Sequence, residues 1–350
     1  MKKFLFIAVI GCMLFLTGCF RLKHDVKFTK DVITKDYSNV IKDELKDFII
    51  KRIDIKNNLI DLEIKKSDDE YLKITAQEDL LDQLSINSIF GKITISGKAN
   101  ERYVVDVIKI ELGIKELTSL DLSQTNSIVD GAIFTQKVKV SLSKRTEMKI
   151  SDVDCAQFNI SASGSTVVNM TNLNTDEFIC ELSGSSIIKA NNLTVKNNVD
   201  FDLSGSSQLE ITSLATKNIK IEATGSSNLI FTYFESAETK CSLSGMSLLE
   251  FDLISVSNIL FLESTGSSKI KAKGNVKVLD ADLSGSSDIS GFDLIILELK
   301  LDASGSSFVN ARVNDKLTVS VSGSSILNYK GKPVVDKIDV TGGSSVNNIE

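Results

Sequence analysis

A short phrase, Ser-Gly-Ser-Ser with small variations, returns about every 20 residues through the last two thirds of this chain. The spacing between successive central glycines varies only from 18 to 21 residues. A fixed period in this range is typical of a solenoid, in which each repeat forms one rung and stacks on the next. The central glycines are Gly164, Gly184, Gly205, Gly225, Gly245, Gly266, Gly285, Gly305, Gly323 and Gly342.

Apolar residues alternate with polar ones on both sides of each central glycine. Positions two, four and six residues before it are mostly apolar, as in Phe178, Cys180 and Leu182, and the alternation resumes four residues after it. This period of two predicts half-buried strands. Each rung therefore reads as a strand, a tight corner, a second strand, another corner and a short third segment. The glycine supplies a positive φ or close packing at the corner, and the serines bond backbone groups there.

The phase of the repeat continues towards the N-terminus beyond the first glycine. Ser143 and Ser123 occupy the position of Ser163 one and two rungs earlier, respectively, and strand-like runs begin near Phe48. The sequence thus predicts an all-β fold, a single-stranded parallel β-helix over residues 48–350, in which ~20-residue rungs give about 15 rungs and a rod on the order of 70 Å long. The single proline suits such a ladder, because each rung needs its backbone N–H groups. Residues 31–47 show helical periodicity and are expected to form a short helix that caps the first rung.

The N-terminus has the pattern of an export signal. Lys2 and Lys3 precede an apolar run over residues 4–16, which ends in Leu-Thr-Gly-Cys at Cys19. This pattern predicts a signal peptide over residues 1–18. The last four residues resemble a bacterial lipobox, which implies cleavage before Cys19 and its attachment to lipid; the alternative is a plain signal peptide with an incidental cysteine. Residues 19–47 would then hold the anchor, a tether and the cap of an exported protein bound to the cell envelope, at the outer membrane in a Gram-negative cell.

The net charge excludes one class of partner, and the positions of two cysteines exclude a disulfide between them. The net charge is −6 and no basic face is evident, so no nucleic-acid partner is expected. Cys180 and Cys241 occupy the same inward position three rungs apart, about 14 Å, which is too far for a disulfide. Together with Cys155 they are expected to act as small buried apolar residues.

Carboxylates recur at the outward position three residues before the central glycine. In a solenoid they would form a column with neighbours about 5 Å apart, and this spacing is repulsive. Lysines two residues further back, such as Lys220 and Lys240, would neutralise part of it. Two interpretations stay open: a solvated face that keeps the rod soluble, or a face that binds an ion or a partner. Its members are Glu181, Asp202, Glu222, Glu263, Asp282, Asp302 and Asp339.

The sequence offers little for catalysis, and no enzyme activity, cofactor or metal site is predicted. The only histidine is His24, in the expected tether, which leaves the serines without a base for a Ser-His-Asp triad. Neither a His/Cys metal site nor a nucleotide-binding fingerprint is present. Some β-helices cleave carbohydrates with carboxylates alone, but the nearly constant rung length here leaves little chain to wall a groove. Regular Ser and Thr files suggest an ice-binding ladder, yet a repeated Thr-x-Thr face is missing.

Both ends of the ladder resemble a known family. Residues 48–55, 60–64 and 71–74 resemble the opening of the "putative auto-transporter adhesin, head GIN domain" family, and residues 329–333 with 342–346 resemble its ending. The resemblance implies a right-handed single-stranded β-helix on a secreted or lipid-anchored bacterial protein. The resulting hypothesis is a lipid-anchored adhesin or envelope scaffold without catalysis, which binds the membrane through Cys19 and a glycan or protein at its surface. A carbohydrate-binding or carbohydrate-active β-helix is the alternative.

Overall fold

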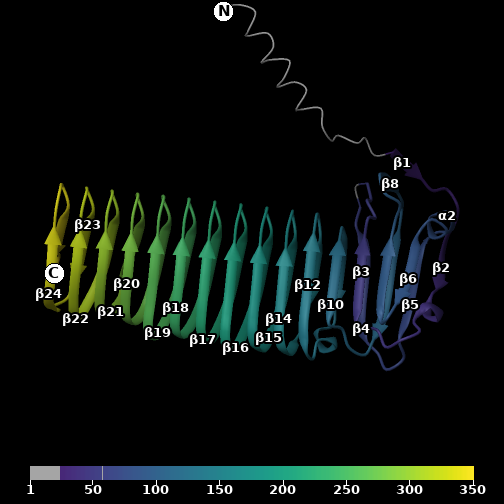
Figure 1. Cartoon of the computed structure of the whole chain (residues 1–350), viewed down its shortest axis with the longest axis horizontal. Coiled ribbons are helices and arrows are strands. Elements are labelled where there is room, and N and C mark those ends of the chain that lie inside the picture. The colour runs from purple at the N-terminus through teal and green to yellow at the C-terminus, as the bar shows by residue number, and fades with distance from the viewer. Residues whose placement is uncertain (1–23, 57) are drawn as a thin grey trace, which may run out of the picture.

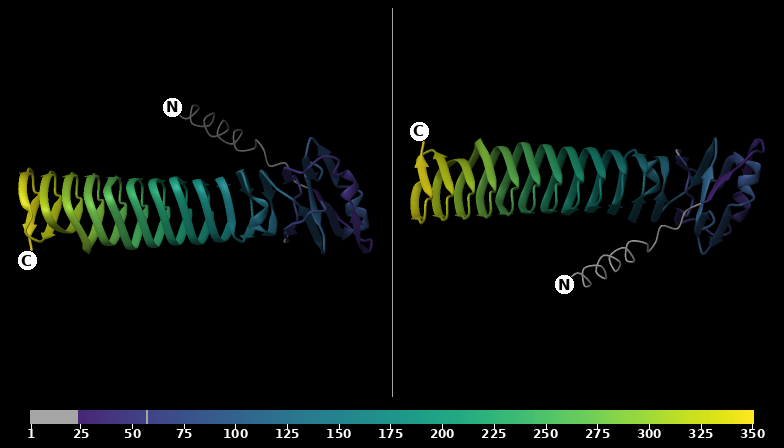
Figure 2. Two further views of the ribbon diagram at one scale, coloured as in Figure 1. Left: turned by 90° about the horizontal axis from the view of Figure 1, so that it is seen from below. Right: turned by 90° about the horizontal axis from the view of Figure 1, so that it is seen from above.

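A computed structural model describes residues 24–56 and 58–350 of the chain. The fold is nearly all β and forms a β-solenoid of about 12 turns, which confirms the predicted fold class. Figures 1 and 2 show a straight rod with a differently folded N-terminal end. The expected signal peptide over residues 1–18 and the lipid site at Cys19 lie outside the described residues. None of the described helices is long and apolar enough to span a bilayer.

The body of the rod consists of rungs that follow one another in chain order (Figure 1). Each long strand pairs in parallel with the strand of the next rung. Pairing skips Thr171 and Asp176 of one rung, and these two breaks separate its three straight segments. The strands are β12 (Lys137–Ser143), β13 (Glu147–Ile150), β14 (Val153–Ala162), β15 (Val167–Leu182), β16 (Ile187–Leu203), β17 (Gln208–Ala223), β18 (Asn228–Leu243), β19 (Leu248–Ser264), β20 (Lys269–Leu283), β21 (Asp288–Ala303) and β22 (Phe308–Val321).

The tight corner needs its glycine for two reasons. Gly184 has a φ of +70°, and a Cβ on it would lie 2.7 Å from the carbonyl oxygen of Gly164 in the rung below. That oxygen accepts the backbone N–H of Ser185 at 2.7 Å. The hydroxyl of buried Ser186 donates to the carbonyl of Ser183 at 2.8 Å, and equivalent serines repeat this bond along the rod. In the corners before Gly164, the residues Arg52, Gln124 and Lys144 adopt positive φ instead of glycine.

Aromatic rings from successive rungs contact one another along the inside of the rod. Phe158, Phe178 and Phe201 follow one another with ring centroids 6.0 and 5.5 Å apart. Cys180 and Cys241 are fully buried in the same core, where burial raises the pKa of each thiol. Register pairs link the two cysteines through Phe201 and Ile221, three rungs apart as predicted.

The first rung in the sequence is not at the end of the rod. Its strands β3 (Asp47–Lys51) and β4 (Ile60–Lys66) pair in parallel with β10 (Ser119–Ser123) and β11 (Thr125–Val129) on one side. On the other side they pair with β7 (Lys92–Ser96) and β9 (Ile108–Ile114). The chain between these rungs therefore folds outward and then returns, which is why the solenoid has about 12 turns and not the expected 15 or so.

Antiparallel strands close this N-terminal end. Strand β5 (Tyr71–Gln77) pairs with β9 and with β2 (Val32–Asp36), while β6 (Ser85–Ile89) forms a hairpin with β7. Strand β1 (His24–Lys27) pairs with β8 (Glu101–Val104), and the short helices are η1 (Ser38–Val40), α2 (Glu78–Leu81) and η2 (Gly131–Ile133). The expected helix over residues 31–47 is wrong. The free edge of β5 offers this segment a row of backbone partners, and its β-branched Val32, Ile33 and Thr34 suit a strand.

The C-terminal end of the rod is formed by β23 (Ile326–Lys330), β24 (Val334–Val340) and β25 (Ser345–Asn348). Strand β24 pairs with β22 on one side and β25 pairs with β23. Every residue of β24 is exposed, including Val335, Ile338 and Val340, which continue the inward files of the rungs below.

Candidate functional site

The outward carboxylates lie side by side along one face of the rod. We call this column the acidic file. Register pairs align Glu181 with Asp202 and Asp202 with Glu222. A second run aligns Glu263, Asp282 and Asp302, and Asp339 follows beside Ser320. The serine members of the file are Ser161, Ser242 and Ser320, and Asp121 extends it beyond Ser141.

Lysines on the same face pair with several members of the file. Lys220 lies 2.8 Å from Glu222, and Lys240 lies 3.7 Å from Glu263. Lys337 contacts Asp339, whereas Lys300 contacts Asp280 of the rung below at 3.9 Å instead of Asp302. Because these pairs are exposed to water, each contributes little to stability.

Two aspartates in the middle of the acidic file have a raised pKa, because they are partly buried and lie beside other carboxylates. Burial raises the pKa of Asp202, and Glu222 and Glu181 raise it further. The pKa of Asp282 rises for the same reasons, first through burial and then through neighbouring carboxylates. Among residues 24–56 and 58–350, no group of three or more His, Cys, Asp or Glu side chains is arranged to hold a metal ion. Binding of an ion or a partner to the acidic file stays a prediction.

Two grooves lie on this face. One, of about 380 Å³, is lined by Asp121, Glu181 and Asp202 together with serines from the corners. The other, of about 360 Å³, is lined by residues such as Lys240 and Phe261. Burial raises the pKa of Asp121 in the first groove. Both grooves are built from residues that recur in every rung, and neither is walled by an inserted loop.

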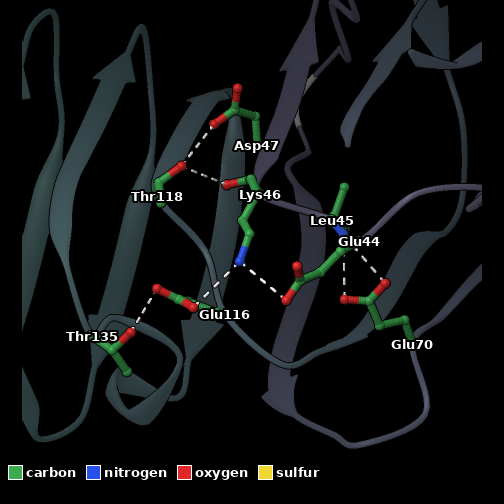
Figure 3. Close-up of polar contacts among 8 residues, drawn as sticks. All are labelled: Glu44, Leu45, Lys46, Asp47, Glu70, Glu116, Thr118 and Thr135. Atoms are coloured by element: carbon green, nitrogen blue, oxygen red, sulfur yellow. Dashed lines mark hydrogen bonds and ion pairs between the residues drawn. The ribbon is translucent and has the colours of Figure 1, made fainter. Parts of the chain in front are cut away.

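A polar cluster joins the cap to the rod (Figure 3). The ammonium of Lys46 lies 3.1 Å from the carboxylate of Glu44 and 3.3 Å from that of Glu116. The Thr135 hydroxyl donates to Glu116 at 2.7 Å, and this bond, with the contact to Lys46, holds the pKa of Glu116 below its usual value. These contacts bring together residues that are distant in the sequence.

Backbone groups complete this junction (Figure 3). The Thr118 hydroxyl lies 3.2 Å from both the Lys46 carbonyl and the Asp47 carboxylate, while the Leu45 N–H donates to the Glu70 carboxylate. Every group has a partner within the protein, so the cluster acts as a structural joint.

A larger groove lies elsewhere, on the face formed by the second segment of each rung. We call it the basic groove; its volume is about 770 Å³. It is lined by four lysines and two carboxylates, with Ile128 57% exposed among them. Sequence reasoning missed it. The signal was there, because Lys149 and Lys189 both stand five residues after the corner residue of their rungs, Lys144 and Gly184. The charged lining residues are Lys65, Lys66, Lys149, Lys189, Glu63 and Asp130.

The chain matches one protein family and is similar to several solved structures. The family model described as "Putative auto-transporter adhesin, head GIN domain" matches residues 52–232 and again residues 220–333. Solved structures similar to the chain include a putative lipid binding protein from Parabacteroides distasonis, at 18% identity, and putative adhesins from P. distasonis and Parabacteroides merdae, each at 16%. Each match covers 93% of this chain and all of the other, with a TM-score of 0.29, which supports no statement about function. No curated protein matches.

Proposed function

Because the chain belongs to the family described as "Putative auto-transporter adhesin, head GIN domain", we propose that it is a non-catalytic adhesive rod held at the bacterial cell envelope by a lipid on Cys19. The observation that carries the proposal is the stacking of about 12 turns in register. Each outward position is repeated along the rod at about 4.8 Å, so one face can make many similar contacts at once. Affinity for a surface then arises from the sum of weak contacts.

The position of the N-terminus supports this arrangement. Strand β1 begins at His24 and lies at the capped end of the rod, with its partner β8 (Figure 1). An anchor at Cys19 stands only five residues earlier in the sequence. The capped end would therefore face the membrane, and the last rungs would lie on the order of 60 Å away at about 12 turns of ~4.8 Å.

Several features support binding rather than cleavage. Glycoside hydrolysis needs two carboxyl groups on opposite sides of the scissile bond. Here the carboxylates of the acidic file lie beside one another along a single face. The turn serines are also poor nucleophiles, because a hydroxyl such as that of Ser186 is buried and donates to a backbone carbonyl. Carbohydrate binding without turnover remains compatible with the adhesive role.

The test compares a deletion strain carrying the wild-type gene with one carrying Cys19→Ser. We expect the wild-type protein in the membrane fraction and restored attachment of cells to surfaces. The serine variant should be released or left unprocessed, and it should not restore attachment. Unchanged mass and fractionation of the variant would refute the anchor.

Attachment and scaffolding can be separated in the same strains. If deletion leaves attachment to every tested surface unchanged, the adhesive role is wrong. An envelope scaffold would instead show itself as increased detergent sensitivity of the deletion strain, with attachment unaffected.

A further inference from the structure

We propose that the basic groove binds a linear anionic polysaccharide that carries a carboxylate on every second sugar. This inference rests on the proposed adhesive function and gives it a ligand class. It is independent of the acidic file, which lies on the first segment of each rung and not on the second.

The basic groove runs along the axis of the rod. Register pairs place Glu63 beside Ile128, Ile128 beside Lys149, Lys149 beside Asn169, and Asn169 beside Lys189. These five residues come from five consecutive rungs, in β4, β11, β13, β15 and β16. Four spacings of ~4.8 Å give a length of roughly 19 Å, enough for several sugars of an extended chain.

The groove is a positive region on a negative protein. The whole chain has a net charge of −6, yet four lysines and two carboxylates line this groove. Lys65 pairs with Glu63 at 2.8 Å, and Lys189 pairs with Glu210 at 2.7 Å. Within the described part of the chain, the ammonium groups of Lys66 and Lys149 pair with no carboxylate, and both side chains are exposed. The backbone N–H of Lys66 donates to the carboxylate of Asp130 at 3.4 Å. Two ammonium groups are thus available to an anion.

Charged and neutral rungs alternate along the basic groove. In the register file through these five rungs, Lys149 and Lys189 occupy the third and fifth rungs, and Ile128 and Asn169 occupy the second and fourth. The first rung holds Glu63, which pairs with Lys65, and Lys66 lies three residues beyond Glu63 in the same strand. Lys149 and Lys189 therefore lie two rungs apart, at roughly 10 Å. A polysaccharide in which uronic acids alternate with neutral sugars presents carboxylates at a comparable interval. The exposed Ile128 can pack against the C–H face of a neutral sugar, and the Asn169 amide can bond its hydroxyl or acetamido group.

Other polyanions fit the groove less well. Single-stranded nucleic acid is held mainly by base stacking on aromatic side chains, and none lines this groove. An acidic peptide in extended form would seek a free sheet edge, whereas the strands here are paired on both sides. A lipid bilayer favours protruding apolar side chains, but only Ile128 is exposed at this site.

The test measures binding of the purified protein to a hyaluronan decasaccharide by titration calorimetry at low salt. In hyaluronan, uronic acids alternate with neutral sugars. A neutral chito-oligosaccharide of the same length is the ligand control. Lys66→Gln combined with Lys149→Gln should weaken hyaluronan binding by about tenfold or more, and the wild-type affinity should fall as salt rises. The matched protein control, Lys217→Gln with Lys277→Gln, removes two exposed lysines outside the groove and should leave binding unchanged.

The outcomes separate the alternatives. Unchanged hyaluronan affinity in the Lys66 and Lys149 double variant, with its circular dichroism preserved, would overturn the assignment. Equal affinity for the chito-oligosaccharide would also overturn it, as would binding only to phosphatidylglycerol vesicles or only to oligothymidine. The assay uses purified protein, so its failure is distinct from that of the adhesive role. If hyaluronan binds but the deletion strain attaches normally, the groove assignment stands and the proposed function fails.

Discussion

The corner glycines make the strongest quantitative prediction, because each meets both a backbone restriction and a close contact. Gly225 has a φ of +75°, and a Cβ on it would lie 2.6 Å from the carbonyl oxygen of Gly205. That oxygen accepts the N–H of Ser226 at 2.8 Å. In Gly225→Ala the left-handed conformation costs about 1–2 kcal/mol. Displacement of the acceptor weakens a hydrogen bond worth about 1 kcal/mol, so a loss of about 2–3 kcal/mol is expected.

Hydrogen exchange read by mass spectrometry is the appropriate assay, since stability in a solenoid is local to a rung and its neighbours. Peptides that cover the corners at Gly205, Gly225 and Gly245 should lose protection in Gly225→Ala, while corners near Gly323 should not change. The matched control is Gly343→Ala, because a Cβ there meets the Gly323 oxygen only at 3.6 Å and Gly343 lacks a positive φ. Equal effects of the two substitutions, or none at Gly225, would refute the reasoning.

Three further predictions concern charge, thiols and the core. The pKa of Asp282 is raised above its ordinary value of 3.8 in the folded protein, so ionisation of this carboxyl destabilises the fold. The destabilisation is fully present at neutral pH. It decreases as the pH falls through the raised pKa and is gone once the pH is below 3.8. Asp282→Asn should therefore raise the Tm at pH 7 and change it little at pH 3, and a lower Tm at pH 7 would contradict this. Burial raises the pKa of the thiols of Cys180 and Cys241, so iodoacetamide should modify them only after denaturation, and rapid labelling of the native protein would contradict their burial. Ile221 is fully buried, so Ile221→Asp should cost more than about 3 kcal/mol, whereas Ile221→Val should cost about 1 kcal/mol; comparable urea midpoints for the two variants would argue against the core position.

The body of the rod could be predicted because each rung repeats the same local pattern. The alternation around Gly184 and its equivalents identifies inward and outward positions, and the outward carboxylates consequently lie in register as described above. Pairs such as Lys220 with Glu222 follow from the same two-residue period. The repeat does not reveal how far neighbouring carboxylates and burial raise the pKa of Asp202, because that depends on the packing of three rungs.

The cap could not be predicted in the same way. Residues 47–66 pair with residues 119–129, and the chain between them makes an excursion with antiparallel strands. Such pairing is non-local and leaves no periodic signal. The segment that holds β2 carries an ambiguous pattern, and the free edge of β5 decides in favour of a strand.

The basic groove could be predicted only in part. Lys149 and Lys189 share one position in the repeat and could have been found by aligning the rungs. Lys66 belongs to the displaced first rung, so its place beside them depends on the pairing of β4 with β11. A site that combines the repeat with the excursion is visible only in three dimensions.

The most direct test of the adhesive role uses the purified protein, free of the rest of the envelope. Beads that carry it through its N-terminal end are flowed over immobilised glycans, matrix proteins and cells, beside beads that carry albumin. We expect at least one surface to retain the protein-coated beads at a shear stress that removes the albumin beads. Detachment of both kinds of bead at the same shear stress on every surface would contradict it.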